Sequence, residues 1–279
     1  MTNASGRVRS GDPEVGMTPD ALSVAAANPL FIGSVGKAFA VLQAFTGSKK
    51  PLGLSDITAA TGLGKSAAQR CCYTLVSLGL LERDPQTRLM RPSVRMLELS
   101  YSYLAADPIT AIAAPYLLKA RESCNQAMNL GIPLDQDIIY IARLRSRQSH
   151  IINPIVGGRA PLFCTSSGRA YLSTLEDSAI ESIFDASDLS PITRHTITQR
   201  DELYKRIEFV RSNGYGLANQ ECIPGELTIG APIYQRPGVA VGAINICVST
   251  PSWSMESVEA ELAPLITQTA HGISMALSS

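Results

Sequence analysis

The sequence predicts an α+β fold, with a small helical segment near the N-terminus and an antiparallel sheet carrying helices behind it. Three short segments before residue 79 repeat apolar residues at helical spacing, and two strand-like runs then flank Asp84-Pro85. Beyond residue 130, short apolar runs and turns alternate with helical segments. A meander of strands with helices at both ends is typical of an α+β domain.

Charge divides the chain more clearly than composition does. The 279 residues are 45% hydrophobic and 17% charged, which allows two domains with buried cores. The whole chain holds 24 basic and 24 acidic residues, but residues 31–93 hold eight basic residues against three acidic ones. A basic segment joined to a mildly acidic remainder favours a nucleic-acid-binding head on a larger body.

The six cysteines and the apolar runs indicate the cellular compartment in which the protein is expected. No apolar run approaches the ~18 residues that span a membrane, so we expect no membrane partner. Residues 1–30 are rich in Gly, Ser, Pro and Ala without periodicity, and are predicted to form a mobile tail. No CxxC spacing occurs, so reduced thiols and a cytoplasmic protein are expected. The cysteines are Cys71, Cys72, Cys124, Cys164, Cys222 and Cys247.

Residues 31–92 have the element order of a winged helix-turn-helix. Helices are predicted over 34–45, with Ser34 as N-cap, over 55–60 and over 65–78, where Gly79 ends the third helix. A hairpin then turns at Asp84-Pro85. Helix, helix, tight turn, helix and hairpin is the order of a DNA-binding winged helix. A protein-docking module of the same order is the alternative.

The third helix carries the side chains expected to contact DNA. Gln69 can pair with adenine and Arg70 with guanine, while Ala67 can touch a thymine methyl group. Lys65 and Ser66 at the helix start suit phosphate. Taken singly, each could be an ordinary solvated side chain, but the cluster favours DNA. Three arginines of the hairpin are expected to follow the DNA backbone: Arg83, Arg88 and Arg91.

Residues 93–107 are predicted to form a linker helix, and residues 108–279 a second domain. The apolar stripe of the linker, which includes Leu97 and Tyr101, could pair with its copy in a dimer. The second domain is predicted to hold helices over 110–128, 167–173, 177–184, 199–213 and 255–277, and strands over 130–134, 138–144, 151–156, 228–234 and 239–248.

Four blocks of the sequence resemble the IclR family of bacterial transcriptional regulators. The resemblance covers residues 31–279 in the family's order, and 92–101 (PSVRMLELSY) with 243–245 is most similar to the branch controlling aromatic-acid catabolism. It implies a DNA-binding regulator with a GAF-like effector-binding domain, assembled as a homodimer or homotetramer on palindromic operators. The blocks are 34–45 (SVGKAFAVLQAF), 54–81, 157–171 (GGRAPLFCTSSGRAY) and 214–248.

The same resemblance implies a small organic acid bound against the sheet. Residues 166–168 should begin a helix, whose N–H groups suit an anion. Asn245 and Cys247 alternate along a strand and so face one side. A hydrogen-bond network without ligand is the alternative, and Asn219 and Cys247 depart from the acidic residue and the serine that are frequent in the family. The implied contacts are Ser166, Ser167, Gly168, Asn219, Glu221, Thr228, Asn245 and Cys247.

An enzyme with a Cys/His site in the second domain is the rival hypothesis. The three histidines, His150, His195 and His271, lack metal-ligand spacing, and the chain has no Gly-x-Ser-x-Gly motif. Gly64-Lys65-Ser66 resembles the end of a phosphate-binding loop, but Ala59 stands where that loop needs glycine. We therefore expect neither a metal nor a cofactor.

Overall fold

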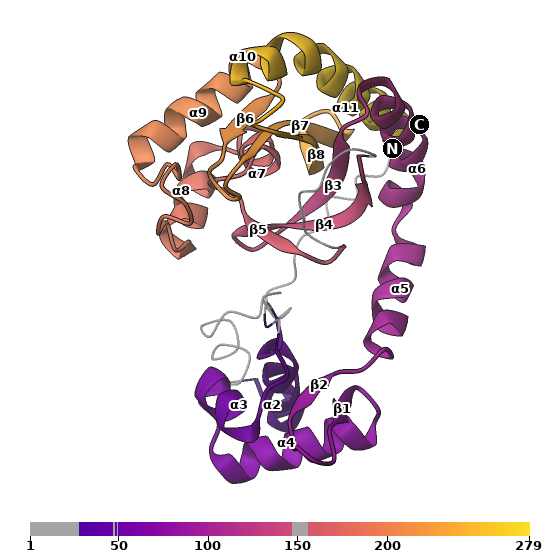
Figure 1. Ribbon diagram of the computed structural model, residues 1–279, viewed down its shortest axis with the longest axis vertical. Helices are drawn as coiled ribbons and strands as arrows, with labels where there is room; N and C mark the ends of the chain where they lie inside the picture. Colours follow the sequence, from indigo (N-terminus) through magenta and orange to yellow (C-terminus); the bar gives the residue numbers. More distant parts are fainter. Residues whose placement is uncertain (1–27, 47, 49, 147–155) are drawn as a thin grey trace. The chain divides into compact units, whose positions relative to one another are not determined.

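A computed structural model describes residues 28–46, 48, 50–146 and 156–279. The chain divides into two compact units, Met1–Tyr103 and Leu104–Ser279 (Figure 1). Nearly all of the predicted tail over 1–30 lies outside the described residues, as does the predicted strand over 151–156 except for Val156. Helix α5 (Met96–Ala106) begins in the first unit and ends in the second.

The N-terminal unit has the predicted order of helices and hairpin. Helices α2 (Gly33–Gln43), α3 (Leu54–Thr61) and α4 (Lys65–Ser77) precede the antiparallel strands β1 (Leu81–Arg83) and β2 (Met90–Pro92). One apolar cluster joins the three helices to the hairpin. Its buried members are Val41, Phe45, Ile57, Ala68, Cys72, Leu75, Leu81 and Met90.

The ends of these helices follow local chemistry, with one error in the prediction. Helix α2 has Ile32 as its N-cap, so Ser34 lies inside the first turn and the predicted cap was wrong. At α3, the Asp56 carboxylate accepts a hydrogen bond from the Gly53 N–H at 2.8 Å, which satisfies one donor of the helix end. Gly62 has a φ of 67°, which glycine adopts without a steric penalty and which makes the tight turn into α4.

The C-terminal unit is built on a six-stranded antiparallel sheet in the order β5-β4-β3-β8-β7-β6. Two of its strands, β5 and β6, escaped prediction because they have only three and four residues and no alternating pattern. The strands are β3 (Ala127–Leu134), β4 (Asp137–Leu144), β5 (Arg159–Pro161), β6 (Gly216–Asn219), β7 (Glu226–Arg236) and β8 (Val239–Ser249).

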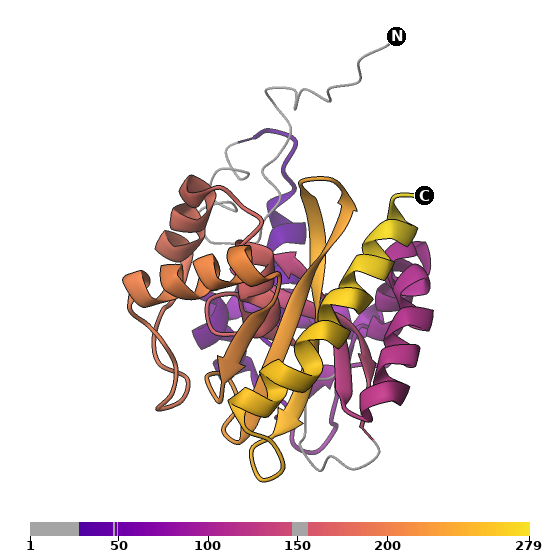
Figure 2. The ribbon, with the colours of Figure 1, turned by 90° about the horizontal axis from the view of Figure 1, so that it is seen from above.

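Helices cover both faces of this sheet. Helices α6 (Pro108–Cys124) and α11 (Ala263–Leu277) pack on one face, where Figure 2 shows α11 crossing the strands with α6 beside it. A short α10 (Met255–Ser257) and a π-helical turn over 258–262 precede α11. The other apolar cluster involves α7 (Ser166–Leu172), α8 (Asp177–Ala186) and α9 (Arg200–Asn213).

The boundary between α6 and β3 corrects the prediction of a helix reaching residue 128. Helix α6 ends at Cys124, because Asn125 takes a left-handed conformation with a φ of 51°. Strand β3 begins at Ala127, two residues after Asn125, and Met128 is buried in the sheet. The apolar residues that suggested a longer helix belong to a strand. A short apolar run alone does not distinguish a helix from a buried strand.

Candidate functional site

Helix α4 presents one face to the core and the opposite face to solvent. Ala68, Cys72 and Leu75 are buried, which leaves the positions between them on the surface. Ala67 is half-buried, toward α2. The remaining side chains predicted to contact DNA are exposed: Lys65, Ser66, Gln69 and Arg70. They are charged or polar, so the outward face can offer hydrogen bonds to base edges and phosphates.

Tyr73 belongs to the same outward face and was missed by the sequence analysis. It is 75% exposed, and it follows Gln69 by four positions and Arg70 by three. Positions three and four apart are neighbours on a helix surface. Aromatic side chains are usually buried, so the exposure of Tyr73 among polar side chains is unusual. The signal in the sequence that could have identified it is its helical spacing from Gln69 and Arg70.

The start of α4 is suited to an anion. Gly64 is the N-cap of α4 and has no side chain. Among the described residues, no side chain therefore accepts a hydrogen bond from the backbone N–H groups of the first turn. Unsatisfied N–H groups and the helix dipole favour a phosphate there. Lys65 and Ser66 lie in that first turn.

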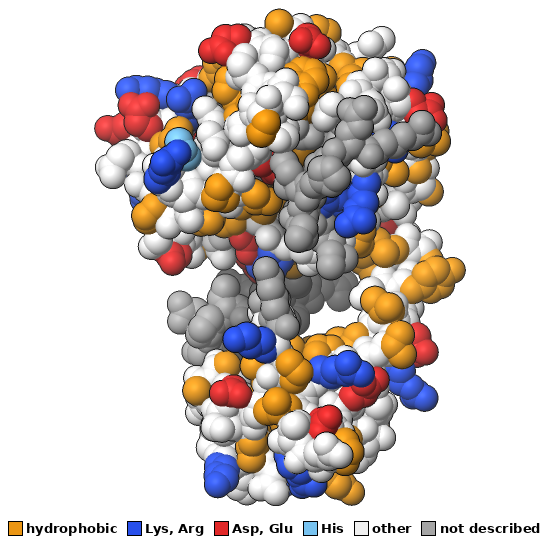
Figure 3. Space-filling model, viewed as in Figure 1, with side chains coloured by type: hydrophobic (Ala, Val, Ile, Leu, Met, Phe, Trp, Pro, Cys, Tyr) orange, Lys and Arg blue, Asp and Glu red, His pale blue; other side chains and the backbone are white. Residues whose placement is uncertain are grey.

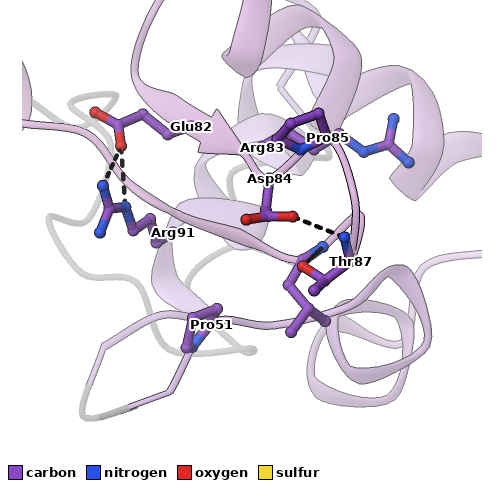
Figure 4. Close-up of a pocket in the computed structure, with 8 residues that line it drawn as sticks. Pro51, Glu82, Arg83, Asp84, Pro85, Thr87 and Arg91 are labelled. Atoms are coloured by element: carbon purple, nitrogen blue, oxygen red, sulfur yellow. Dashed lines mark hydrogen bonds and ion pairs between the residues drawn. The ribbon is translucent and has the colours of Figure 1, made fainter.

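The hairpin, or wing, is shaped by Asp84 and carries three arginines, of which Arg83 and Arg91 are drawn in Figure 4. The Asp84 carboxylate accepts from the N–H groups of Gln86 at 2.9 Å and Thr87 at 2.7 Å. These bonds, that of Thr87 foremost, lower the pKa of Asp84. The Arg91 guanidinium bonds to Glu82 at 2.8 Å, so contact with phosphate would require Arg91 to leave an exposed ion pair (Figure 4). Arg83 and Arg88 are exposed.

The face of the sheet opposite α6 and α11 holds a row of buried polar side chains, here called the polar strip. Asn129 of β3 lies opposite Asn245 of β8 and donates to its Oδ1 at 3.2 Å. Both amides also donate to the Cys247 sulfur, at 3.3 Å and 3.2 Å. Thr228 of β7 lies opposite Cys247. Three adjacent strands therefore place four buried polar groups together.

Asn129 was missed by the sequence analysis. It is a polar residue within the apolar run of β3 (AMNLGIPL), flanked by Met128 and Leu130 on the opposite face. The same reasoning that singled out Asn245 applies to it, since a buried amide needs a partner. What the sequence did not show is that β3 pairs with β8, which brings the two amides together.

Two charged residues extend the polar strip to its outer strands. Arg143 of β4 lies opposite Asn129, and Glu226 of β7 is two residues before Thr228, so strand alternation places both on the strip's face. Burial raises the pKa of Glu226 to about 7, and Arg143 and a hydrogen bond with Cys247 oppose that rise in part. Burial likewise lowers the pKa of Arg143.

Ser166 and Ser167 at the start of α7 lie against the same face. A Cβ atom on Gly230 would come within 2.9 Å of the Ser166 and Ser167 backbone, and Gly230 lies opposite Asn245. Ser166 Oγ is buried with no hydrogen-bond partner among the described residues. The Gly168 N–H is not free, because the N-cap Thr165 Oγ1 accepts from it at 3.1 Å. That part of the anion-binding prediction was wrong.

Asn219 and Glu221 are not brought to the polar strip. Asn219 is exposed and lies opposite Leu227, whose side chain belongs to the cluster on the other face of the sheet. Both carboxylate oxygens of Glu221 bond to the Arg169 guanidinium, at 2.7 Å and 2.5 Å, and one also accepts from the Ile197 N–H at 3.2 Å. Glu221 is thus the partner of a buried arginine.

The rival enzyme hypothesis requires a Cys/His site in the second domain. The described residues contain no group of three His, Cys, Asp or Glu side chains placed to hold a metal ion, and His150 lies outside them. A hydrogen bond with Cys222 and burial raise the pKa of Cys164, the opposite of what an activated nucleophile needs. None of the described helices has both the length and the apolar character required to span a membrane.

The comparisons with known proteins agree over both units. The model of the IclR helix-turn-helix domain matches residues 34–85, and that of the bacterial transcriptional regulator IclR C-terminal domain matches 101–275. The Pca regulon regulatory protein of Pseudomonas putida is 31% identical over 240 residues, which cover 86% of this chain and 82% of that protein.

Solved structures agree as well. A transcriptional regulator from Rhodococcus sp. RHA1 is 32% identical with a TM-score of 0.74, covering 89% of this chain and 99% of that one. An IclR homolog from Microbacterium hydrocarbonoxydans, solved with 4-hydroxybenzoate, shares the fold at 21% identity and a TM-score of 0.71, covering 88% and 98%. The chain therefore belongs to the IclR family of bacterial transcriptional regulators and carries that family's helix-turn-helix DNA-binding domain.

Proposed function

We propose that this regulator binds a small organic acid on the polar strip, and that the bound acid modulates its contact with operator DNA. In this proposal residues 31–92 bind DNA, residues 93–107 form the helix that links the two domains, and residues 108–279 bind the effector. The observation that supports it is the strip itself, which places buried polar groups in the middle of a sheet. Burying polar groups is unfavourable unless they are satisfied, so such a cluster suits a polar ligand.

The chemistry of the strip suits an acid that also carries a hydrogen-bonding group. The Arg143 guanidinium can bind a carboxylate, and charge-assisted bonds of this kind are among the strongest in proteins. The amides of Asn129 and Asn245 and the hydroxyls of Thr228 and Ser166 can donate and accept along the same face. Glu226, with a pKa of about 7, can accept as a carboxylate or donate as an acid.

Two relatives guide the choice of an aromatic acid. One similar protein is named for the Pca regulon, and one protein of the same fold was solved with 4-hydroxybenzoate. Tyr140 lies opposite Gly131, on the face of the strip, and offers an aromatic ring. The first ligands to test are therefore 4-hydroxybenzoate and benzoate, with acetate as an aliphatic acid.

Titration calorimetry with these acids tests the proposal directly. We expect 4-hydroxybenzoate to bind and to raise the melting temperature, because a ligand at 100 times its dissociation constant adds about 2.7 kcal/mol of stability. Gel shifts with operator DNA, with and without the acid, test the modulation. Binding of none of these acids would remove the support for an aromatic effector.

For the N-terminal unit we propose DNA contacts through Lys65, Ser66, Gln69 and Arg70, with Tyr73 added. Ala67 contributes at most its methyl group, because it is half-buried. In the wing, Arg83 and Arg88 are the better candidates for phosphate, since Arg91 is held by Glu82. Basic side chains stand over the visible face of this unit, interspersed with acidic ones (Figure 3).

A homodimer on a palindromic operator completes the proposal. Leu97, Leu99 and Tyr101 of α5 are 60–71% exposed, and α5 has no buried residue. Apolar side chains gather on α5 in Figure 3. An apolar helix surface as exposed as this one suits a second copy of the chain.

A further inference from the structure

Two cysteines that are distant in sequence lie together on the α7 side of the C-terminal unit. Cys164 precedes the N-cap of α7, and Cys222 follows the last residue of β6 by three positions. Both belong to the apolar cluster that also contains Leu162, Phe163 and Leu203. The polar strip, by contrast, uses Cys247, so the two thiols are not part of the proposed effector site.

One guanidinium bonds to the chain neighbours of both cysteines. Arg169 Nε donates to the carbonyl of Phe163, the neighbour of Cys164, at 2.9 Å. Its Nη atoms donate to Glu221, the neighbour of Cys222, at 2.7 Å and 2.5 Å. Because Arg169 is buried, these bonds are shielded from water and fix the two segments against each other. The two segments that carry the cysteines are therefore held side by side, and both cysteines pack in the same apolar cluster.

The two thiols differ in access and in acidity. Cys164 is fully buried, whereas Cys222 is partly exposed. The hydrogen bond between them lowers the pKa of Cys222 and raises that of Cys164, and burial and the nearby Glu226 partly offset the change at Cys222. A partly exposed, more acidic thiol beside a buried partner is the arrangement of an attacking and a resolving cysteine.

We propose that Cys164 and Cys222 form a site of reversible oxidation, at which a peroxide converts the two thiols into an intramolecular disulfide. Cys222 ionises to a thiolate that attacks one oxygen of hydrogen peroxide; the O–O bond breaks, Cys222 sulfenic acid forms, and the leaving hydroxide takes up the proton that the thiol released and becomes water. The Cys164 sulfur then attacks the sulfenic sulfur, its proton leaves with the hydroxyl group as a second water, and the S–S bond forms. The protein loses two electrons and the peroxide gains them.

The bridge would tie the segment that begins α7 to the segment that follows β6. Cys164 lies two residues before Ser166, so oxidation acts next to the polar strip. The other four cysteines are placed differently. Cys71 and Cys72 are successive residues of α4, Cys124 ends α6, and Cys247 accepts two amide hydrogen bonds in the sheet.

The test uses the full-length reduced protein treated with hydrogen peroxide. We expect the loss of two thiols per chain, a mass lower by two hydrogen atoms, and a peptide cross-linked between Cys164 and Cys222 under non-reducing conditions. Dithiothreitol should restore both thiols. This readout requires neither effector nor DNA, so it can fail or succeed independently of the proposed function.

Variants separate this site from the other thiols. Cys222→Ser should abolish the cross-link, while the matched variant Cys124→Ser, also partly exposed, should form it at the wild-type rate. Oxidation of Cys222 to sulfinic acid without a cross-link, or a bridge between two chains only, would overturn the proposal. If Cys222→Ser does not fold, the wild-type peptide map alone decides, because it identifies the bonded pair.

Discussion

Asn245 is the side chain on which the proposed effector site depends most. Its amide is buried and bonded to Asn129 and Cys247, so replacing it removes ligand contacts and leaves Asn129 with one partner fewer. We expect Asn245→Ala to weaken binding of 4-hydroxybenzoate by about 1–3 kcal/mol, the usual effect of an unmet buried polar group. Calorimetry measures this loss.

Asn219→Ala is the matched control, since Asn219 is exposed and lies on the opposite face of the sheet. Its ligand affinity should equal that of the wild type. Unchanged binding in Asn245→Ala would place the effector elsewhere. A collapse of ligand-free DNA affinity in the same variant would mean that Asn245 is structural.

Glu226 should make stability depend on pH. Its pKa is raised from 4.5 to about 7 in the folded protein, so the folded chain holds the proton more tightly than the unfolded chain. Its contribution is therefore full below pH 4.5 and is lost as the pH rises through 7, a change on the order of 3 kcal/mol. Glu226→Gln should remove this decline between pH 4.5 and 7.

Urea unfolding at several pH values measures the effect, with the exposed Glu122→Gln as control. That control should retain the wild-type dependence on pH. An equal decline in wild type and Glu226→Gln would show that other groups cause it.

Arg70 should carry sequence specificity. It is exposed on the outward face of α4, where a guanidinium can bond bidentately to guanine. We expect Arg70→Ala to weaken operator binding by about 1–3 kcal/mol and binding to a scrambled duplex by less. Gel shifts compare the two duplexes, and Lys119→Ala controls for the lost charge because Lys119 is exposed in the other unit. Equal losses on both duplexes would make Arg70 a phosphate contact.

At the scale of elements, the placement of α7 depends on the ion pair between Arg169 and Glu221. Both side chains are buried, so removing one charge leaves the other uncompensated. We expect Glu221→Gln to lower the free energy of unfolding by about 3–5 kcal/mol. The exposed pair of Arg91 and Glu82 is the control. Glu82→Gln should change the free energy of unfolding by less than about 1 kcal/mol. If urea unfolding gave similar losses of stability for Glu221→Gln and Glu82→Gln, the buried ion pair would not be what holds α7 in place.

The long, periodic elements were predictable from the sequence, and the short ones were not. Helices α4 and α9 lie within one or two residues of their predicted bounds, because glycines follow them and their apolar stripes are regular. Strand β6 has four residues, and its edge position depends on pairing with β7, a contact that no local pattern encodes. The excess length predicted for α6 arose because an apolar run fits a helix or a buried strand equally well.

The polar strip was predicted only in part, because the sequence shows local alternation but not which strands pair. Asn245 and Cys247 share a face by strand alternation, which the sequence shows. Thr228 was implied only by the family resemblance, and its position opposite Cys247 places it on the same face. Asn129 and Arg143 join them only through the pairing of β3 with β8 and β4. The position of Glu221 could not be foreseen, because its partner Arg169 lies 52 residues away and the two meet only in the folded unit.

At the scale of the whole molecule, the exposed apolar surface of α5 bears on assembly. Leu97 and Tyr101 are separated by four positions and so lie on one side of the helix, exposed by 65% and 71%. Solvent exposure of such a stripe is unfavourable, and pairing two copies would remove it from water. Two heads held together also bind two half-sites at once, which raises affinity without any new contact.

We therefore expect the wild-type protein to be at least a dimer at micromolar concentration without DNA. The double variant Leu97→Glu/Tyr101→Glu should shift it toward monomer, because like charges would then face each other across the pair. Ser102→Glu is the matched control, since Ser102 lies on another side of the same exposed helix. Light scattering measures the assembly, and gel shifts should show a parallel loss of operator affinity in the double variant alone. A wild-type monomer in light scattering would contradict the dimer. A double variant that stays dimeric would move the interface away from α5.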